Sequence, residues 1–437
     1  MSASSRRIDR LETTFDHGGI VANAGLLVPA TLMGRLGLEA LINTWVATGS
    51  SRPGRKILTI VAAMLAGGTH IDHVDMLRAG ATQAVLPFRV MAPSTIGTFL
   101  RSFTFGHVRQ LDAVLSRTLA RAWTAGAGPG GQPLVVDLDS TICEVHGKQK
   151  QAAGYGYTKV LGYHPLLATR AGTGEVLFAR MRRGSANTAR GVVRFVDELI
   201  GVLDRSGATG SLTVRADSGF WSWKLIDRLN THGIGWSITV RLHKTMKTAI
   251  AAIPETAWQD IDYTLGGHAQ VAETVYTVGK GRRRRSVRLI VRRTRLADKT
   301  QRRLWPDWRH HAFITSDHET SMVEADRFHR EHAVVELAIR DLKEGAGLEH
   351  IPSGHYHANA AWLLCAVLAH NLGCWTTLLA EHPPVTNRTR RTRLISLAAV
   401  LVNRSGQMVL RLPARWPWAD QFLQSLTVIR ALPAPSG

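Results

Sequence analysis

The fold is most constrained by a change of pattern at a glycine-rich stretch, residues 124–132. Before this stretch apolar residues recur at helical spacing, and after it short β-branched runs alternate with amphipathic segments. We expect strands at 133–138, 174–180, 212–216 and 235–240, and helices at 188–203 and 223–232. This alternation predicts an α/β fold in which helices cover both faces of a sheet.

The preceding part, residues 1–124, is expected to form a helical region. Its helices are expected at 31–46, 55–66, 96–103 and 107–123, the third preceded by a capping sequence at 93–95. A small helical unit that carries Arg and Lys fits a helix-turn-helix reader of DNA, but it fits an ordinary helical bundle equally well. The sequence leaves both interpretations open and singles out no recognition helix.

A third pattern begins near residue 245. Residues 245–317 read as a basic, β-rich insertion with strands at 271–278 and 286–294. Between these strands stand four consecutive arginines, Arg282, Arg283, Arg284 and Arg285. They are either a DNA contact or a solvated turn. Helices are expected again at 321–343 and 357–379, so that 125–244 and 318–380 flank the insertion, and 381–437 is a basic C-terminal tail.

Composition narrows the choice of partner and compartment. The chain of 437 residues has 54 Lys and Arg against 33 Asp and Glu, a formal charge of +21. Such a surplus favours a polyanion, most commonly nucleic acid, as partner. The three cysteines match no zinc spacing and no disulfide framework. The uninterrupted apolar runs are short for a bilayer and the N-terminus lacks a secretory pattern, so we expect a cytoplasmic protein without a membrane partner.

Acidic residues stand at the ends of two expected strands. Asp137 and Asp139 are two residues apart, so their side chains project from the same face of the first strand. Two carboxylates on a buried strand are costly unless they are paired or bind metal. Asp217 closes the strand at 212–216, directly before a Ser-Gly turn.

A third acid, Glu336, lies in the helix expected at 321–343. Helical spacing puts His332, Glu336 and Lys343 on one face, with Arg340 one turn beyond the glutamate. Hard divalent cations prefer oxygen ligands, and two such ions can align the attacking and leaving oxygens of a phosphoryl transfer. Cationic neighbours would then stabilise charge on the phosphate.

The order and setting of these acids resemble the DDE transposases, specifically the insertion-sequence family numbered 1380. That family has Asp-x-Thr after a first strand, an aspartate that closes a later strand, and a helix with Tyr-x2-Arg-x3-Glu-x6-Lys. Asp139-Ser140-Thr141, Asp217 before Ser-Gly-Phe, and Glu336 with Lys343 fit the three parts in turn. His329 and His332 depart from the family's Tyr and Arg. The segment at 145–148 also looks like a family segment.

The resemblance implies a fold, a reaction and partners. The fold would be an RNase H-like catalytic core interrupted by the β-rich insertion, with a helical domain before it and helices after it. Asp139, Asp217 and Glu336 would hold two Mg²⁺ or Mn²⁺ ions, with Asp137 behind them. His332, Arg340 and Lys343 would contact DNA phosphates. The protein would act as a dimer on double-stranded DNA, cut at the ends of an insertion sequence, and join the freed 3′-hydroxyl to target DNA.

Two other functions compete with this interpretation. The sequence from 135 to 141 also matches the Asp-x-Asp-x-Thr signature of haloacid dehalogenase-like phosphatases, with Asp137 as nucleophile and Asp139 as general acid. The position of the motif behind a helical region and the high charge count against it. A non-catalytic DNA-binding protein is the other alternative, and the presence of all three acids argues against it.

Overall fold

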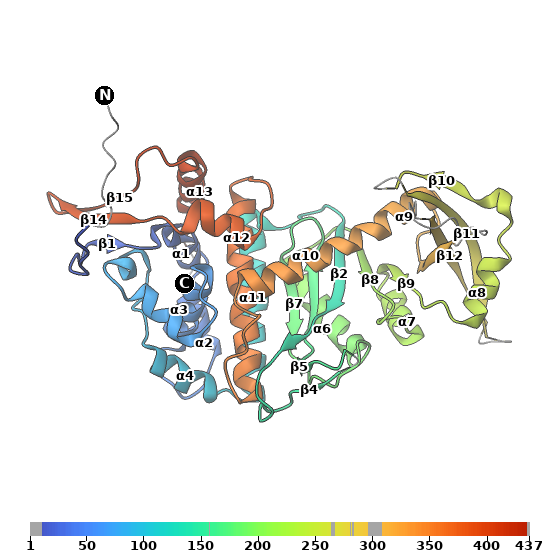
Figure 1. Ribbon diagram of the computed structural model, residues 1–437, viewed down its shortest axis with the longest axis horizontal. Coiled ribbons are helices and arrows are strands. Elements are labelled where there is room, and N and C mark those ends of the chain that lie inside the picture. Colours follow the sequence, from blue (N-terminus) through green and yellow to red (C-terminus); the bar gives the residue numbers. More distant parts are fainter. Residues whose placement is uncertain are drawn as a thin grey trace.

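The computed structural model describes residues 11–156, 158–263, 267–279, 281, 284–295 and 308–434. The molecule is elongated (Figure 1): helices from both ends of the chain lie at one side, the main sheet is central, and the hairpin of the insertion lies at the other side. The acidic positions identified in the sequence belong to the central part, between the two outer units.

The first part is helical, as expected. The helices are α1 (Leu27–Arg35), α2 (Leu38–Trp45), α3 (Pro53–Leu65), α4 (Pro93–Arg101) and α5 (Phe105–Ala122). The single helix expected at 31–46 is wrong, because Gly37 adopts a left-handed conformation with φ of 61° and separates α1 from α2. Proline starts both α3 and α4, where its missing N–H costs nothing. Since α3 is buried along its whole length, it cannot lie in a DNA groove.

The described residues form one large sheet of nine strands in the order β10-β11-β12-β13-β9-β8-β2-β6-β7. Its central strands are β2 (Leu134–Ser140), β6 (Leu166–Arg170), β7 (Val176–Arg180), β8 (Leu212–Ala216) and β9 (Gly235–Thr239). The four expected strands are confirmed, whereas β6 was not predicted from the sequence. β2 pairs parallel with β8 and β8 parallel with β9, whereas β2–β6 and β6–β7 are antiparallel. A separate small sheet consists of β3 (Cys143–Glu144), β4 (Gly154–Tyr155) and β5 (Leu161–Tyr163).

Helices α6 (Val192–Ser206), α7 (Trp223–Thr231) and α11 (Tyr356–Leu379) pack around the central strands. α11 contacts β7, α3 and α5, and so joins the sheet to the N-terminal helices. In the described part of the chain, α11 is long and apolar enough to span a membrane, as is the bent pair α1–α2 if counted as one span. In α11 94% of the apolar window is buried inside the protein, as in the core helix of a globular domain.

The insertion is β-rich, as expected, and it continues the main sheet. It contains α8 (Lys244–Ala251), β10 (Gln259–Ile261), β11 (His268–Val278), β12 (Arg285–Arg295) and β13 (Arg309–Thr315). β13 joins the insertion to the core by pairing with β9 over three residues, from Phe313 opposite Thr239 to Thr315 opposite Ser237. Helix α9 (Met322–Arg330) covers the hairpin and completes a small core of Val271, Ile290, Phe313 and Ala325.

The C-terminal segment folds back on the N-terminal helices (Figure 1). It contains α12 (Asn387–Arg390), β14 (Ala399–Arg404), β15 (Gln407–Arg411) and α13 (Ala419–Ala431). β14 pairs with β15 and with the short strand β1 (Ile20–Val21), and α13 packs against α1. The two ends of the chain therefore form one structural unit.

Candidate active site

Asp139 and Asp217 lie at the carboxyl ends of neighbouring parallel strands. Asp139 is the penultimate residue of β2, and Asp217 directly follows β8. Because parallel strands point the same way, their carboxyl ends meet at one edge of the sheet, where α/β proteins bind ligands. The Ser-Gly turn after β8 fixes the second acid, since the backbone N–H of Gly219 donates to Asp217 Oδ1 at 2.9 Å.

Glu336 reaches the same place from a helix. A continuous helical run crosses the molecule from the insertion towards α11 (Figure 1). It consists of α9, a 3₁₀ turn (Glu331–Val334), α10 (Val335–Arg340) and a π-helical turn (Asp341–Gly345). A cavity of about 420 Å³ is lined by Asp139, Asp217 and Glu336 together with Ser140, Thr141, Thr188, Ile339, Arg340, Lys343, Glu344 and Glu349. The structure thus brings the three acids predicted from the sequence into one polar cavity.

The electrostatics of the cavity favour a bound cation. Burial raises the pKa of Asp139 to about 6, and repulsion by Asp217 and Glu336 adds to the rise. The backbone N–H of Ser140, 2.6 Å from Asp139 Oδ1, opposes it. Within the described residues no group of three or more His, Cys, Asp and Glu side chains, these three acids included, is arranged to hold a metal ion as it stands. The three carboxylates line one cavity without forming a ready metal site, and their oxygens are the donors that Mg²⁺ and Mn²⁺ prefer.

Asp137 lies behind the cavity, in a buried ion pair. Arg215 donates to both of its oxygens, from Nε at 2.8 Å and from Nη2 at 3.0 Å, and both side chains are at most 3% exposed. The two residues face each other across the parallel β2–β8 pair. Arg215 Nη1 also donates to the carbonyl of Phe328 at 2.6 Å. Asp137 is therefore held by a bidentate arginine and does not line the cavity.

His332 completes this pair from the helical run. Its Nδ1 lies 2.8 Å from Asp137 Oδ1, and its side chain is 12% exposed. Each member of the network precedes one acid of the cavity: Asp137 by two residues, Arg215 by two residues and His332 by four. The network thus ties together the three elements that carry the acids. From the sequence we expected His332 to contact a DNA phosphate. In the structure its Nδ1 contacts Asp137 instead.

The other cationic residues predicted for the site differ in their exposure and in their hydrogen-bond partners. Arg340 is exposed and Lys343 half-buried, and both line the cavity. Lys343 Nζ donates to the carbonyl of Ile142, in the loop after β2, at 3.0 Å. His329, which stands where the resembling family has Tyr, lies between Ser237 and Thr239 at 2.8 Å from each hydroxyl. Burial lowers the pKa of His329 to about 3, so this imidazole is neutral and supports the sheet.

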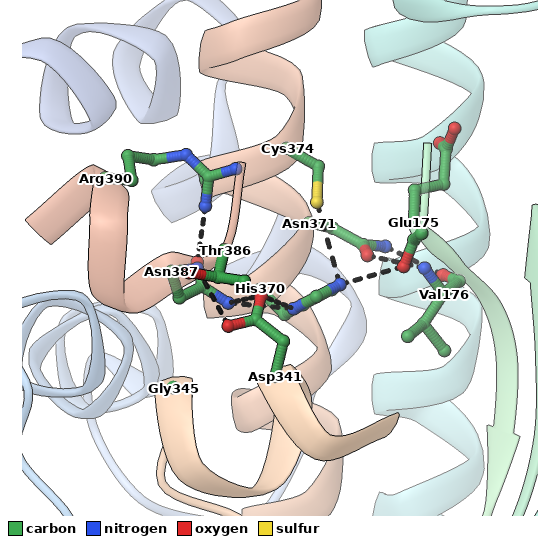
Figure 2. A network of polar contacts seen from close by, with 12 residues as sticks. Glu175, Val176, Asp341, Gly345, His370, Asn371, Cys374, Thr386, Asn387 and Arg390 are labelled. Atoms are coloured by element: carbon green, nitrogen blue, oxygen red, sulfur yellow. Dashed lines mark hydrogen bonds and ion pairs between the residues drawn. The ribbon is translucent and has the colours of Figure 1, made fainter. Parts of the chain in front are cut away.

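A second buried network holds the far end of the helical run (Figure 2). Asp341 accepts the backbone N–H of Asn387 at 2.8 and 3.0 Å, and the Asn387 side-chain amide at 2.9 Å. The same amide lies 2.8 Å from His370 Nδ1, and His370 Nε2 donates to the carbonyl of Gly174 at 2.9 Å. These contacts link the run to α11, to α12 and to the β6–β7 turn. No motif in the sequence points to them.

The arginine run is described in part. Arg282 and Arg283 lie outside the described residues, and Arg284 is exposed. Arg285 forms a bidentate pair with Asp227 of α7, at 2.6 and 2.9 Å, and its guanidinium lies 4.9 Å from the Trp223 ring. At least one arginine of the run therefore holds the insertion against the core.

These features define a mixed α/β protein with a large sheet and a carboxylate-lined cavity at the ends of two parallel strands. The family model described as transposase DDE domain, group 1, matches residues 4–434. The chain therefore belongs to this family and is a transposase of the DDE type.

Similarity to individual proteins is weaker than the match to the family. No curated protein matches the chain. One solved structure that it resembles is the cryo-EM structure of the piggyBac transposase synaptic complex with hairpin DNA. The match has 13% identity and a TM-score of 0.43, and covers 86% of this chain and 79% of that one. The family assignment rests on the family model alone.

Proposed function

We propose that this transposase cuts DNA at the ends of an insertion sequence and joins the freed 3′-hydroxyl to target DNA. The observation that carries the proposal is the cavity in which Asp139, Asp217 and Glu336 meet, although Glu336 is 119 residues beyond Asp217 in the chain. These acids would hold two Mg²⁺ or Mn²⁺ ions. Bound there, the ions would activate the attacking oxygen and stabilise the leaving oxygen of an in-line displacement.

The remaining side chains have separable roles in this proposal. Arg340 and Lys343 contact phosphate oxygens from the helical side of the cavity, where they lower the cost of the charge that develops in transfer. Asp137 and His332 act as positioning residues, because they contact each other, Asp137 is also paired with Arg215, and neither lines the cavity. The ion pair keeps β2, β8 and the helical run in fixed relation.

The finer fold and family assignments are also proposals. The order β7-β6-β2-β8-β9, antiparallel on one side of β2 and parallel on the other, supports an RNase H-like core. The fit of Asp139, Asp217, Glu336 and Lys343 to the family pattern supports a relative of the insertion-sequence 1380 group. A charge of +21 supports double-stranded DNA as partner. We further propose that the protein acts in the cytoplasm, on chromosomal or plasmid DNA. Because two element ends must be held together, we propose a dimer on DNA.

The phosphatase alternative requires Asp137 as a free nucleophile. In the structure this carboxylate is buried and both of its oxygens accept from Arg215. A nucleophile so engaged cannot reach a phosphate ester without breaking the pair. The buried pair thus favours the transposase over the phosphatase.

The decisive experiment uses the gene with its flanking DNA on a plasmid. Purified wild-type protein with Mg²⁺ or Mn²⁺ is expected to cut at the borders of the element, and the breaks are mapped by sequencing. Asp217→Ala, or addition of EDTA, is expected to abolish the breaks while DNA binding persists. If wild type binds these borders specifically but never cuts, the protein is a DNA-binding protein only.

The arginine run provides a second test. Replacing Arg282 to Arg285 by serines is expected to weaken DNA binding and to reduce the slope of log affinity against log salt by about 0.9 for each phosphate that is no longer neutralised. The exposed pair between Arg285 and Asp227 contributes only about 0–1 kcal/mol, so the variant is expected to stay folded. Affinity and salt slope equal to wild type would identify the run as a solvated turn.

A further inference from the structure

Four histidines from three separate parts of the chain meet beyond the end of the helical run. His70 and His73 follow α3, His146 follows β3, and His350 follows the π-helical turn. The ring of His70 stacks on that of His350 with centroids 3.8 Å apart, and it lies 5.0 Å from the ring of His73. His146 acts electrostatically on His350. We call these four residues the histidine cluster.

Backbone contacts fix the segments that carry the cluster. The N–H of Gln151 donates to the carbonyl of Gly354 at 2.9 Å, and Lys150 Nζ donates to the carbonyl of Ile351. On the other side, Gly347 packs so closely on the loop after α3 that an added Cβ would lie 2.9 Å from the carbonyl oxygen of Gly68. The cluster is therefore built into the junction between the N-terminal helices and the catalytic part.

The histidine cluster adjoins the catalytic cavity. Glu349, the neighbour of His350 in the chain, lines that cavity, as does Lys343 of the π-helical turn. His70 and His146 are exposed. A DNA strand that leaves the cavity past Glu349 would meet these imidazoles next.

The charges around the cluster suit an anion. Among the described residues, the histidines that pair with carboxylates are His232, His268, His332 and His370, none of them in the cluster. Burial lowers the pKa of His350, and the neighbouring His70, Lys150, His146 and His73 lower it further. These cationic groups repel one another, and a bound phosphate would relieve the repulsion.

We propose that the histidine cluster, with Lys150, binds a backbone phosphate of the DNA that flanks the cleaved bond. The proposal rests on the proposed function, since it requires DNA in the adjoining cavity. It accounts for the segment around His146, which the catalytic acids leave without a role. A bound phosphate favours the protonated form of the imidazoles beside it, and imidazolium in turn binds phosphate better than neutral imidazole does, so the contact strengthens as the pH falls from 8 to 6.

The test measures DNA binding, so that it does not depend on cutting. In an Asp217→Ala background, a labelled duplex of the gene's flanking DNA is titrated with protein at pH 6.0 and pH 8.0. His70→Gln combined with His350→Gln is expected to weaken binding several-fold at pH 6.0 and little at pH 8.0. The salt slope at pH 6.0 is expected to fall by about 0.9, the value for one phosphate. His318→Gln, an exposed histidine elsewhere, serves as the control.

A second variant distinguishes the loss of a phosphate contact from a folding defect. His70→Arg keeps a positive charge at all pH values and is expected to make binding at pH 8.0 as tight as that of the parent at pH 6.0. Equal affinities and salt slopes for parent and double variant at pH 6.0 would overturn the proposal. In that case, cutting by the wild type at the borders of the element would still support the proposed function.

Discussion

Replacing Asp139 by asparagine is expected to abolish DNA cleavage and also to stabilise the metal-free protein at pH 7.5. The stabilisation follows from the pKa of Asp139, which burial and repulsion by the other acids raise to about 6 from an ordinary 3.8. A raised carboxyl pKa favours the folded state below pH 3.8, and this advantage is lost as the pH rises through 6. Above pH 6 the ionised side chain costs roughly 1–3 kcal/mol, which the neutral amide avoids.

The measurement is the melting temperature of wild type and Asp139→Asn from pH 4 to pH 8 with EDTA. The difference is expected to grow between pH 4 and 6 and then to level off. Mg²⁺ is expected to stabilise wild type alone, because the variant lacks a ligand. Asp317→Asn is a control of opposite sign: there hydrogen bonds from Thr320 and Glu319 outweigh partial burial and lower the pKa. A variant that is less stable than wild type at pH 7.5 would contradict the electrostatic account of the cavity.

Arg215→Met is expected to give the largest loss of stability, about 3–5 kcal/mol, because it leaves the Asp137 carboxylate buried and without its partner. It also removes the donor to the Phe328 carbonyl, which ties β8 to the helical run. Urea unfolding of the metal-free protein, followed by tryptophan fluorescence, measures the effect. Cleavage is expected to fall with it, since the three acids lose their common support.

Two further variants separate charge burial from lost packing. Arg228→Met breaks the half-buried pair with Asp197, which water still reaches, and is expected to cost about 1 kcal/mol. Adding Asp137→Leu to Arg215→Met is expected to recover part of the loss, because no buried charge then remains unpaired. If Arg215→Met and Arg228→Met were equally mild, the buried network would not be what holds β2, β8 and the helical run together.

The sequence was a sufficient guide to the elements that carry the acids. Asp139 and Asp217 each follow a short β-branched run, and that local pattern predicts a strand end without knowledge of its neighbours. Glu336 lies on a helix with a clear apolar face. Gly37 divides the region that we expected to form one helix. The sequence could not predict this, because a glycine between two helical patterns is compatible with one continuous helix and with two separate ones.

What the sequence could not provide depends on strand pairing and helix phase. The pair between Asp137 and Arg215 requires the parallel register of β2 and β8, which no local pattern encodes. The direction of His332 depends on the 3₁₀ turn at Glu331–Val334, which departs from regular α-helical spacing. Likewise, β13 extends the main sheet because three of its residues pair with three residues of β9, and the two strands lie far apart in the chain.

The helical run from Met322 to Gly345 has a mechanical consequence. Its 24 residues make a rod of about 36 Å that begins at the insertion and carries Glu336 beyond its midpoint. Asp139 and Asp217 belong to the sheet, and the contacts of Arg215 and His332 clamp the rod to the strands that carry these two acids. A displacement of the insertion would therefore have to break the Asp137–Arg215–His332 network before it could move Glu336 relative to the other two acids.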